Sequence, residues 1–184
     1  MEKLKKNIVV GITGSIAIYK TCEVIRKLIK VNWNVKVIMT ENAKKLISPL
    51  TFEVLSKNPV YFDMFEKKTY DEDHIKLSEF ASIILICPAT ANIIGKIASG
   101  ICDDLLTTTV ISFSGPVIFA PAMNENMWKN KILQENVKKL KRYGYYFIGP
   151  EEGELASGKI GIGRLSDVQK IINFVEKVYT DFKK

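Results

Sequence analysis

Cysteine and histidine are scarce in this sequence, which contains three cysteines and one histidine among 184 residues. Cys22, Cys87 and Cys102 form no CxxC pair and lie in apolar or helical stretches, as the reduced thiols of cytoplasmic proteins commonly do. A structural zinc site needs four Cys or His ligands at characteristic spacings, and the sequence offers no such set. We therefore expect neither a disulfide framework nor a metal centre.

Long apolar runs and a concentrated stripe of basic residues are also missing. No apolar run reaches the roughly 18 residues of a membrane-spanning helix, and the stretch from Ile8 to Ile12 is too short for the core of a signal peptide. Lys and Arg total 27 against 20 for Asp and Glu, giving a net charge of +7, but the basic residues are dispersed and form no stripe with interleaved aromatics. We expect a cytoplasmic protein that binds no membrane and no nucleic acid, with a charge that suits an anionic ligand.

The composition is that of a globular domain, with 47% apolar and 26% charged residues. A chain of this length buries roughly 70% of its extended surface on folding. It contains no repeat, low-complexity tract or linker. The sequence therefore predicts a single domain over residues 1–184.

Short apolar runs alternate with amphipathic segments along the whole chain. The runs predict strands at 8–12, 35–39, 83–87, 117–120 and 145–148. The amphipathic segments predict helices near 17–30, 43–56, 91–112, 125–142 and 167–181. This alternation is typical of an α/β fold with a single doubly wound parallel sheet, Rossmann-like, with helices on both faces.

The residues that follow four of these strands are small, polar or proline-bearing. In a doubly wound sheet, ligands bind outside the carboxyl ends of the strands, so these clusters are the candidate site. The four clusters are 11–15, 40–42, 88–92 and 121–124.

The first cluster, Gly11-Ile12-Thr13-Gly14-Ser15, joins a strand to a helix. Glycine allows a ligand to approach the backbone closely, and a helix N-terminus offers free N–H groups to a phosphate. The spacing is not GxGxxG and no Walker lysine follows, so a single phosphate, as in a mononucleotide, fits better than a dinucleotide. The alternative is a tight turn in which Ser15 caps the helix.

Two other strand ends carry amides and hydroxyls. Pro88-Ala89-Thr90-Ala91-Asn92 would suit a flat ring system, with Thr90 and Asn92 bonding to its heteroatoms. Asn124 is a neutral amide that could bind a substrate carboxylate without competing for protons. In both cases the alternative is an ordinary helix N-cap.

Three further features lie outside the strand ends. His74, the single histidine, is flanked by acidic residues that would raise its pKa if they lie close, and the alternative is a surface residue without a role. Four glycines between 153 and 163 indicate a mobile lid or clamp, in which Arg164 either meets an anion or anchors the loop. Thr107, Thr108 and Thr109 are poor helix formers and hint at a polar or interface role.

Together these clusters resemble the family of flavin-containing cysteine decarboxylases. The octapeptide Pro-Ala-Met-Asn-Glu-Asn-Met-Trp at 121–128 matches the family signature PxMNxxMW. His74-Ile75, 88–92 and 14–17 also fall at family-like positions, and the resemblance extends from about residue 7 to 175. Within the family, the sequence is most similar to the phosphopantothenoylcysteine decarboxylases, which in many bacteria form the amino-terminal half of a bifunctional coenzyme A enzyme.

This resemblance implies a cofactor and a set of site residues. The cofactor is FMN, and the implied FMN-binding residues are Gly14, Ser15, Ile16, Thr40, Asn42, Thr90, Ala91, Asn92 and Ala122. The implied catalytic residues are His74 as acid/base, Asn124 as carboxylate binder and the clamp residue Ser157. The implied substrate contacts are Asn124, Met127, Glu154, Leu155 and Ala156.

The resemblance also implies a lyase reaction in coenzyme A biosynthesis. Flavin oxidises the cysteine moiety of 4′-phosphopantothenoyl-cysteine to a thioaldehyde, CO₂ leaves, and reduction of the resulting enethiolate gives 4′-phosphopantetheine. Family members form homotrimers, often assembled into homododecamers with active sites between subunits, and some work with a fused or separate synthetase.

One departure from the family pattern concerns the clamp. Pantothenoyl-type enzymes carry a cysteine where this sequence has Ser157, and that cysteine assists the reduction of the enethiol. Peptidyl-cysteine decarboxylases lack it and stop at the enethiol, so a peptidyl-cysteine oxidative decarboxylase is the alternative function. A flavin prenyltransferase should lack the octapeptide. A non-catalytic flavoprotein regulator that binds a phosphatase usually carries a long acidic tail, whereas this sequence ends in Asp181-Phe182-Lys183-Lys184.

Overall fold

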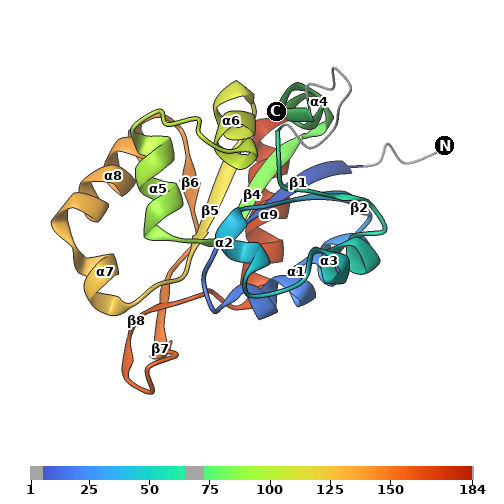
Figure 1. Ribbon diagram of the computed structural model, residues 1–184. Helices are drawn as coiled ribbons and strands as arrows, with labels where there is room; N and C mark the ends of the chain where they lie inside the picture. Colours follow the sequence, from blue (N-terminus) through green and yellow to red (C-terminus); the bar gives the residue numbers. More distant parts are fainter. Residues whose placement is uncertain (1–5, 65–72, 184) are drawn as a thin grey trace.

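The computed structural model describes residues 6–64 and 73–183, and these form a parallel sheet covered by helices on both faces, with a separate hairpin (Figure 1). The strands of the sheet are β1 (Lys6–Ile12), β2 (Trp33–Met39), β3 (Val60–Tyr61), β4 (Ile83–Ala89), β5 (Val117–Pro121) and β6 (Tyr146–Phe147). The hairpin consists of β7 (Glu151–Glu154) and β8 (Ile160–Arg164), which pair antiparallel.

The helices fall between and after these strands. They are α1 (Ile18–Lys30), α2 (Glu41–Lys44), α3 (Pro49–Ser56), α4 (Asp73–Phe80), α5 (Ala91–Ala98), α6 (Leu105–Ser112), α7 (Glu125–Lys129), α8 (Lys131–Arg142) and α9 (Val168–Phe182). None of the helices in the described ranges combines the length and the apolar character that a bilayer crossing would require.

The strand order in the sheet is β3-β2-β1-β4-β5-β6, the doubly wound arrangement predicted from the sequence. β1 pairs in parallel with β2 on one side and with β4 on the other. The chain therefore reverses its direction of travel across the sheet at the β1–β4 pair. The residues that follow β1 and β4 lie at this switch point, where a doubly wound sheet binds its ligand.

Alternate side chains of each strand point into two separate apolar layers. From β1, Ile8 and Val10 enter the layer under α1 and α9, whereas Val9 enters the layer under α5, α6 and α8. All three side chains are fully buried. Burial on both faces is why these strands appear in the sequence as continuous apolar runs without polar alternation.

Three segments predicted as single helices each form two. The short helix α2 ends before Pro49, because proline has no N–H to continue the hydrogen bonds of a preceding helix. Ser48 is the N-cap of α3, and Pro49 occupies its first position, which proline suits. Asn130 ends α7 and caps α8 through its side-chain oxygen. The strand β3, the helix α4 and the pairing of β7 with β8 were not predicted, because each is too short or too polar to give a clear periodic pattern.

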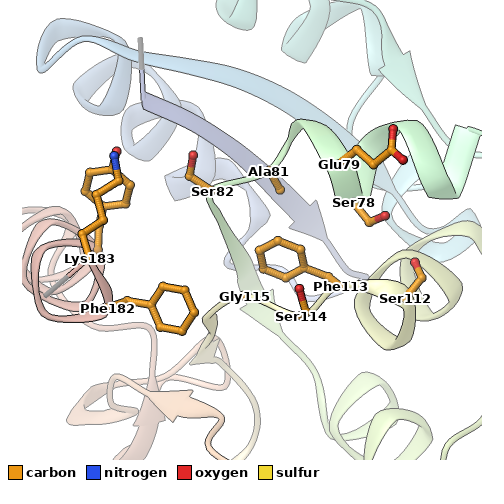
Figure 2. A pocket seen from close by; sticks show the side chains of 11 residues that line it. Ser78, Glu79, Ala81, Ser82, Ser112, Phe113, Ser114, Gly115, Phe182 and Lys183 are labelled. Carbon is orange, nitrogen blue, oxygen red and sulfur yellow. The ribbon is translucent and has the colours of Figure 1, made fainter. Parts of the chain in front are cut away.

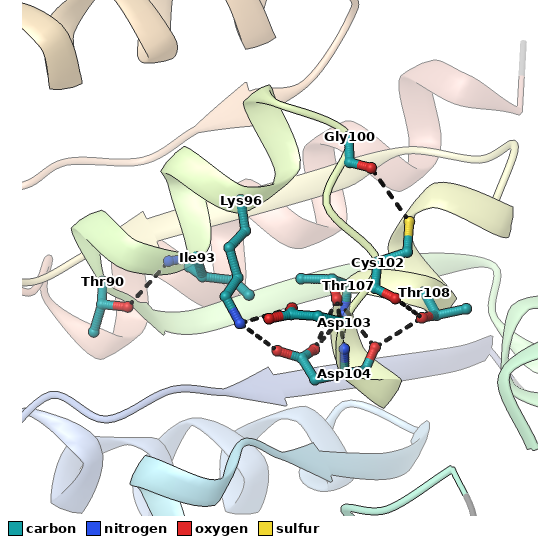
Figure 3. Close-up of polar contacts among 9 residues, drawn as sticks. All are labelled: Thr90, Ile93, Lys96, Gly100, Cys102, Asp103, Asp104, Thr107 and Thr108. Atoms are coloured by element: carbon teal, nitrogen blue, oxygen red, sulfur yellow. Dashed lines mark hydrogen bonds and ion pairs between the residues drawn. The ribbon is translucent and has the colours of Figure 1, made fainter.

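The predicted helix 91–112 is interrupted at 99–104, where polar contacts hold a loop between α5 and α6 (Figure 3). Lys96 on α5 contacts Asp103 at 2.7 Å and Asp104 at 3.2 Å. Asp104 caps α6 by accepting a hydrogen bond from the N–H of Thr107 at 2.8 Å. Thr108 and Thr109 donate their hydroxyls to backbone carbonyls of the preceding turn. In this structure the three threonines therefore make local helix contacts.

Candidate active site

A cavity of about 650 Å³ lies beyond the carboxyl ends of the central strands. The hairpin β7–β8 projects from the same side of the molecule (Figure 1). Its walls come from the start of α1, the start of α5, the connection from β5 to α7, and the hairpin. The predicted site residues that line it are Gly14, Ser15, Ile16, Thr90, Ala91, Ala122, Asn124, Met127, Glu154, Leu155, Ala156 and Ser157.

The turn after β1 forms one wall of the cavity. The N–H groups of Gly14 and Ile16 donate no hydrogen bond within the described part of the chain. Ser15 donates its hydroxyl to the carbonyl of Ala122 at 3.1 Å, which ties the turn to the end of β5. A Cβ on Gly14 would lie 2.7 Å from the Cβ of Asn42, so glycine is needed for this close approach. The turn thus presents free N–H groups suited to an anion.

A second wall is built where β4 passes into α5. Thr13 donates its hydroxyl to the carbonyl of Pro88 at 2.7 Å and accepts from the N–H of Thr90 at 3.2 Å. The Thr90 side chain then accepts from the N–H of Ile93 as the N-cap of α5. These bonds fix the β1 and β4 turns to each other, and small side chains such as Ala91 leave room for a flat group between them.

Asn124 is the N-cap of α7, and the same side chain lines the cavity. Its Oδ1 accepts a hydrogen bond from the N–H of Asn126 at 2.8 Å, which caps α7. Since the carbonyl side of the amide is occupied, the Nδ2 group is the part left to donate to a ligand. Asn124 is exposed and lines the cavity, so its amide offers a donor to an anionic group such as a carboxylate.

The hairpin that closes the cavity is anchored at both ends. Near its base, Glu151 pairs with Lys170 at 2.9 Å and with Arg164 at 3.5 Å. On β8, the carbonyl of Gly163 accepts from the N–H of Met123 at 3.0 Å, and the N–H of Ile162 donates to Glu125 at 3.4 Å. Arg164, considered above as a possible anion binder, thus helps to anchor the hairpin. Ser157 is exposed in the turn at the tip.

Four of the predicted site residues do not line the cavity of a single chain: Thr40, Asn42, Asn92 and His74. Asn42 packs behind Gly14, and Thr40 donates its N–H to the end of β1, so both stand directly beside the cavity. His74 is half-buried in the first turn of α4. Its acidic neighbours Asp71 and Glu72 lie outside the described residues.

A second hollow, of about 530 Å³, opens at the opposite edge of the sheet, between the end of α4, the loop from α6 to β5, and the end of α9 (Figure 2). Ser78, Phe113 and Phe182 are among its lining residues. It lies at the amino ends of β4 and β5 and contains none of the site residues predicted from the sequence. The cavity at the carboxyl ends is therefore the candidate site.

Cys87 on β4 and Cys22 on α1 are poor candidates for nucleophiles. Burial raises the pKa of the Cys87 thiol to about 12, even though Thr21 contributes a hydrogen bond. Burial likewise raises the pKa of Cys22. A thiol with a raised pKa stays protonated near neutrality and reacts slowly.

Sequence reasoning missed several residues that line the cavity. Tyr19 and Lys20 come from the first helix, and Leu165 follows the hairpin. The sequence carries no signal for these three residues, since their positions in the lining depend on how α1 meets the hairpin.

The arrangement can hold a phosphate monoester at the 13–16 turn, a flat ring against Thr90 and Ala91, and a carboxylate near Asn124. The Flavoprotein family model matches residues 1–180.

Two curated relatives are similar to the chain over nearly its whole length. The coenzyme A biosynthesis bifunctional protein CoaBC of Borreliella burgdorferi is 47% identical over 175 residues, which is 95% of this chain but 45% of that protein. The chain thus spans less than half of this bifunctional relative. A probable phosphopantothenoylcysteine decarboxylase of Streptococcus mutans is 40% identical over 177 residues, covering 95% of this chain and 99% of that protein.

Solved structures share the fold and the arrangement of elements. A cysteine-to-serine variant of PPC decarboxylase, complexed with pantothenoylaminoethenethiol, matches with a TM-score of 0.88 and 27% identity, covering 96% of this chain and 100% of that one. The FMN-dependent cysteine decarboxylase SpaF matches with a TM-score of 0.84 and 29% identity, covering 97% of this chain and 98% of that one.

Proposed function

Because the chain belongs to the Flavoprotein family, and within it to the phosphopantothenoylcysteine decarboxylases, we propose that it decarboxylates 4′-phosphopantothenoyl-cysteine in coenzyme A biosynthesis. The observation that carries this proposal is the cavity at the switch point of the sheet. It brings an anion-binding turn at Gly14–Ile16 together with the amide of Asn124 and the tip of a closing hairpin. A cofactor and a carboxylate-bearing substrate can therefore be held side by side.

FMN fits the residues that line this cavity. The free N–H groups of Gly14 and Ile16 would hold its phosphate, and the start of α1 adds a favourable helix dipole. Thr90 and Ala91 would face the ring system. When bound, FMN supplies the two-electron oxidation that turns the cysteine moiety into a thiocarbonyl, which accepts the electrons left behind when CO₂ departs.

The chain's own residues bind the substrate and move its protons. The Nδ2 group of Asn124 donates to the substrate carboxylate and, being neutral, leaves that carboxylate ionised until CO₂ departs. Residues 154–157 cover the substrate and exclude water from the reacting carbon. His74 acts as the acid/base residue, since a ring nitrogen of an imidazole can take up a proton and return it.

The position of His74 supports an active site shared between copies of the chain. Within one chain it lies on α4 and lines no part of the cavity that contains Asn124. We infer that the chains assemble as a homotrimer, able to stack into a homododecamer, in which α4 of one copy completes the cavity of the next. A closed ring of this kind uses one type of contact repeated by rotation.

Ser157 favours a second candidate function, the oxidative decarboxylation of a peptide ending in cysteine. The serine hydroxyl stands at the tip of the hairpin, where the pantothenoyl-type pattern has a cysteine. An enzyme without that thiol can release CO₂ and stop at the enethiol. The sequence Gly-Glu-Leu-Ala at 153–156 matches the pattern of the coenzyme A enzymes, so we favour the phosphopantothenoyl substrate over the peptide.

The test is to incubate the purified, FMN-loaded protein with 4′-phosphopantothenoyl-cysteine and, separately, with a cysteine-terminated peptide. Mass spectrometry of the products should show loss of CO₂ from the first substrate. Loss of CO₂ from the peptide alone would select the second candidate, and no loss from either would refute both. The released cofactor should have the mass of FMN, and the mass of FAD would contradict the proposed cofactor.

A further inference from the structure

We propose that Lys20 recognises the terminal phosphate of the substrate and thereby sets the preference for phosphorylated over unphosphorylated substrates. The inference rests on the proposed function and names a specificity-determining residue within the same cavity. Lys20 lies in the first turns of α1 and lines the cavity beside Tyr19.

The charges around the cavity are few, and Lys20 is the cation without a carboxylate partner among them. The charged residues in its lining are Lys20, Glu154 and Arg164. The guanidinium of Arg164 is 3.5 Å from the carboxylate of Glu151, which also pairs with Lys170 at 2.9 Å and so offsets the charge of Arg164 only in part. No carboxylate among the described residues lies within ion-pair distance of Lys20, and its recorded contact is the Tyr19 ring, 5.9 Å from Nζ.

The cavity has separate places for two phosphates. The FMN phosphate has its own donors in the Gly14 and Ile16 N–H groups, which need no side-chain cation. Lys20 lies beyond these groups along α1, and the neighbouring Tyr19 is 60% exposed, so this part of the lining is the rim. A second anion arriving from solvent would meet Lys20 before it reached the turn.

The shape of the substrate requires a cation at the rim. The carboxylate and the phosphate of 4′-phosphopantothenoyl-cysteine are at opposite ends of an extended molecule. When the carboxylate contacts Asn124, the phosphate must lie away from the reacting carbon, toward the mouth of the cavity. A lysine there is suitable because its long side chain lets one ammonium group follow a phosphate on a flexible chain.

The test compares two substrates with FMN-loaded protein: 4′-phosphopantothenoyl-cysteine and the same molecule without its phosphate. Lys20→Met should lower kcat/KM for the phosphorylated substrate about tenfold, the size expected for one charge-assisted hydrogen bond, mainly through KM. It should leave kcat/KM for the unphosphorylated substrate within about twofold of the parent. Lys20→Arg should restore most of the difference.

Lys30→Met is the matched control, because it removes an exposed lysine from the other end of α1. It should change neither substrate's kinetics. An equal loss with both substrates, or weaker FMN binding in a fluorescence titration of Lys20→Met, would assign Lys20 to the cofactor or to folding and overturn the inference. Unchanged kinetics would overturn it too. A parent protein that releases no CO₂ from either substrate would instead refute the proposed function, and the inference with it.

Discussion

At the scale of single residues, we predict that Ser157 decides which product leaves the enzyme. In the proposed reaction, decarboxylation depends on the cofactor, His74 and Asn124, but saturation of the enethiolate also needs a proton donor at the tip of the hairpin. A thiol, with a pKa near 8.5, donates a proton far more readily than a serine hydroxyl. We therefore predict that the protein releases CO₂ and stops at the enethiol, once per site without oxygen because the two electrons then stay on the cofactor, whereas Ser157→Cys yields 4′-phosphopantetheine over many turnovers.

The measurement is the mass of the product under anaerobic conditions, with and without this substitution. Ser157 is exposed in the turn, so the exchange of one small side chain for another should not disturb the fold. Ser157→Ala serves as the control and should behave like the parent. Fully reduced product from the parent over many turnovers would show that another group supplies the proton.

Asn124 permits a substitution that separates its capping of α7 from its proposed binding of the substrate carboxylate. A carboxylate is as good an N-cap as an amide, so Asn124→Asp should keep the bond to the Asn126 N–H and the start of α7. It removes the Nδ2 donor and places a negative charge against the substrate carboxylate. We expect a similar melting temperature, retained FMN and at least a hundredfold lower kcat/KM, about 3 kcal/mol or more. Normal turnover by this variant would exclude Asn124 as the carboxylate binder.

At the scale of elements, the hairpin β7–β8 depends on Glu125 for its position over the cavity. Glu125 occupies a variable position of the signature, pairs with Lys129 at 2.8 Å and accepts from the N–H of Ile162. A Cβ on Gly161 would lie 2.8 Å from its carboxylate, so the hairpin packs closely against it. We predict that Glu125→Ala loosens the hairpin with little change in the melting temperature, because these contacts are only partly buried and the ion pair to Lys129 lies near solvent.

Trypsin cleavage after the exposed Lys159 at the hairpin tip measures this loosening. Cleavage of Glu125→Ala should be several-fold faster than that of the parent, and KM for the substrate should rise. Glu152→Ala is the matched control, since it removes an exposed carboxylate from the same hairpin. The described residues provide no partner for this carboxylate. Equal cleavage rates for both variants would show that Glu125 does not hold the hairpin.

The same anchors make the hairpin sensitive to acid. The hydrogen bond from Lys129 lowers the pKa of Glu125 below its ordinary 4.5, and the hydrogen bond from Lys170 does the same for Glu151. Folding favours the ionised form of both, so their contribution is complete above pH 4.5 and is lost as the pH falls through the lowered values. Hydrogen exchange at 151–164, corrected for intrinsic rates, should therefore accelerate below that pH before the sheet loses protection. Simultaneous loss of protection would contradict this order.

At the scale of the whole molecule, a shared active site predicts complementation between inactive variants. His74→Asn should retain FMN and lose on the order of 10²–10⁴-fold in rate. Asn124→Asp is inactive for a different reason. If His74 of one chain serves the Asn124 of its neighbour, a trimer reassembled from equal amounts of both should contain intact sites at about one position in four, since each site draws on two chains.

Activity near a quarter of the parent after mixing, unfolding and joint refolding would support this assembly. Refolding each variant alone is the control and should give no recovery. A mixture as inactive as its components, or a monomeric mass in solution with FMN fully bound, would place both residues in the site of one chain.

The sequence by itself determined the class of fold, the main strands and the family, because each of these leaves a local pattern of residue types in the chain. Continuous apolar runs such as Ile83–Cys87 mark strands buried on both faces. The octapeptide at 121–128 identifies the family from its residue types, whatever its position in the folded chain. The glycine turn at 11–15 was also recognisable, since its residue types directly reflect close backbone approach.

Only the tertiary structure decided which of these residues meet. Glu125 touches Ile162, 37 positions further along the chain, and Ser15 bonds to Ala122 across 107 positions. Neither contact leaves a periodic trace in the sequence, because each depends on strand order and on the angle at which the hairpin returns. The same cause placed Lys20 on the rim of the cavity and His74 on a helix outside it. Local patterning selects the elements, whereas their packing around the β1–β4 switch point selects the site.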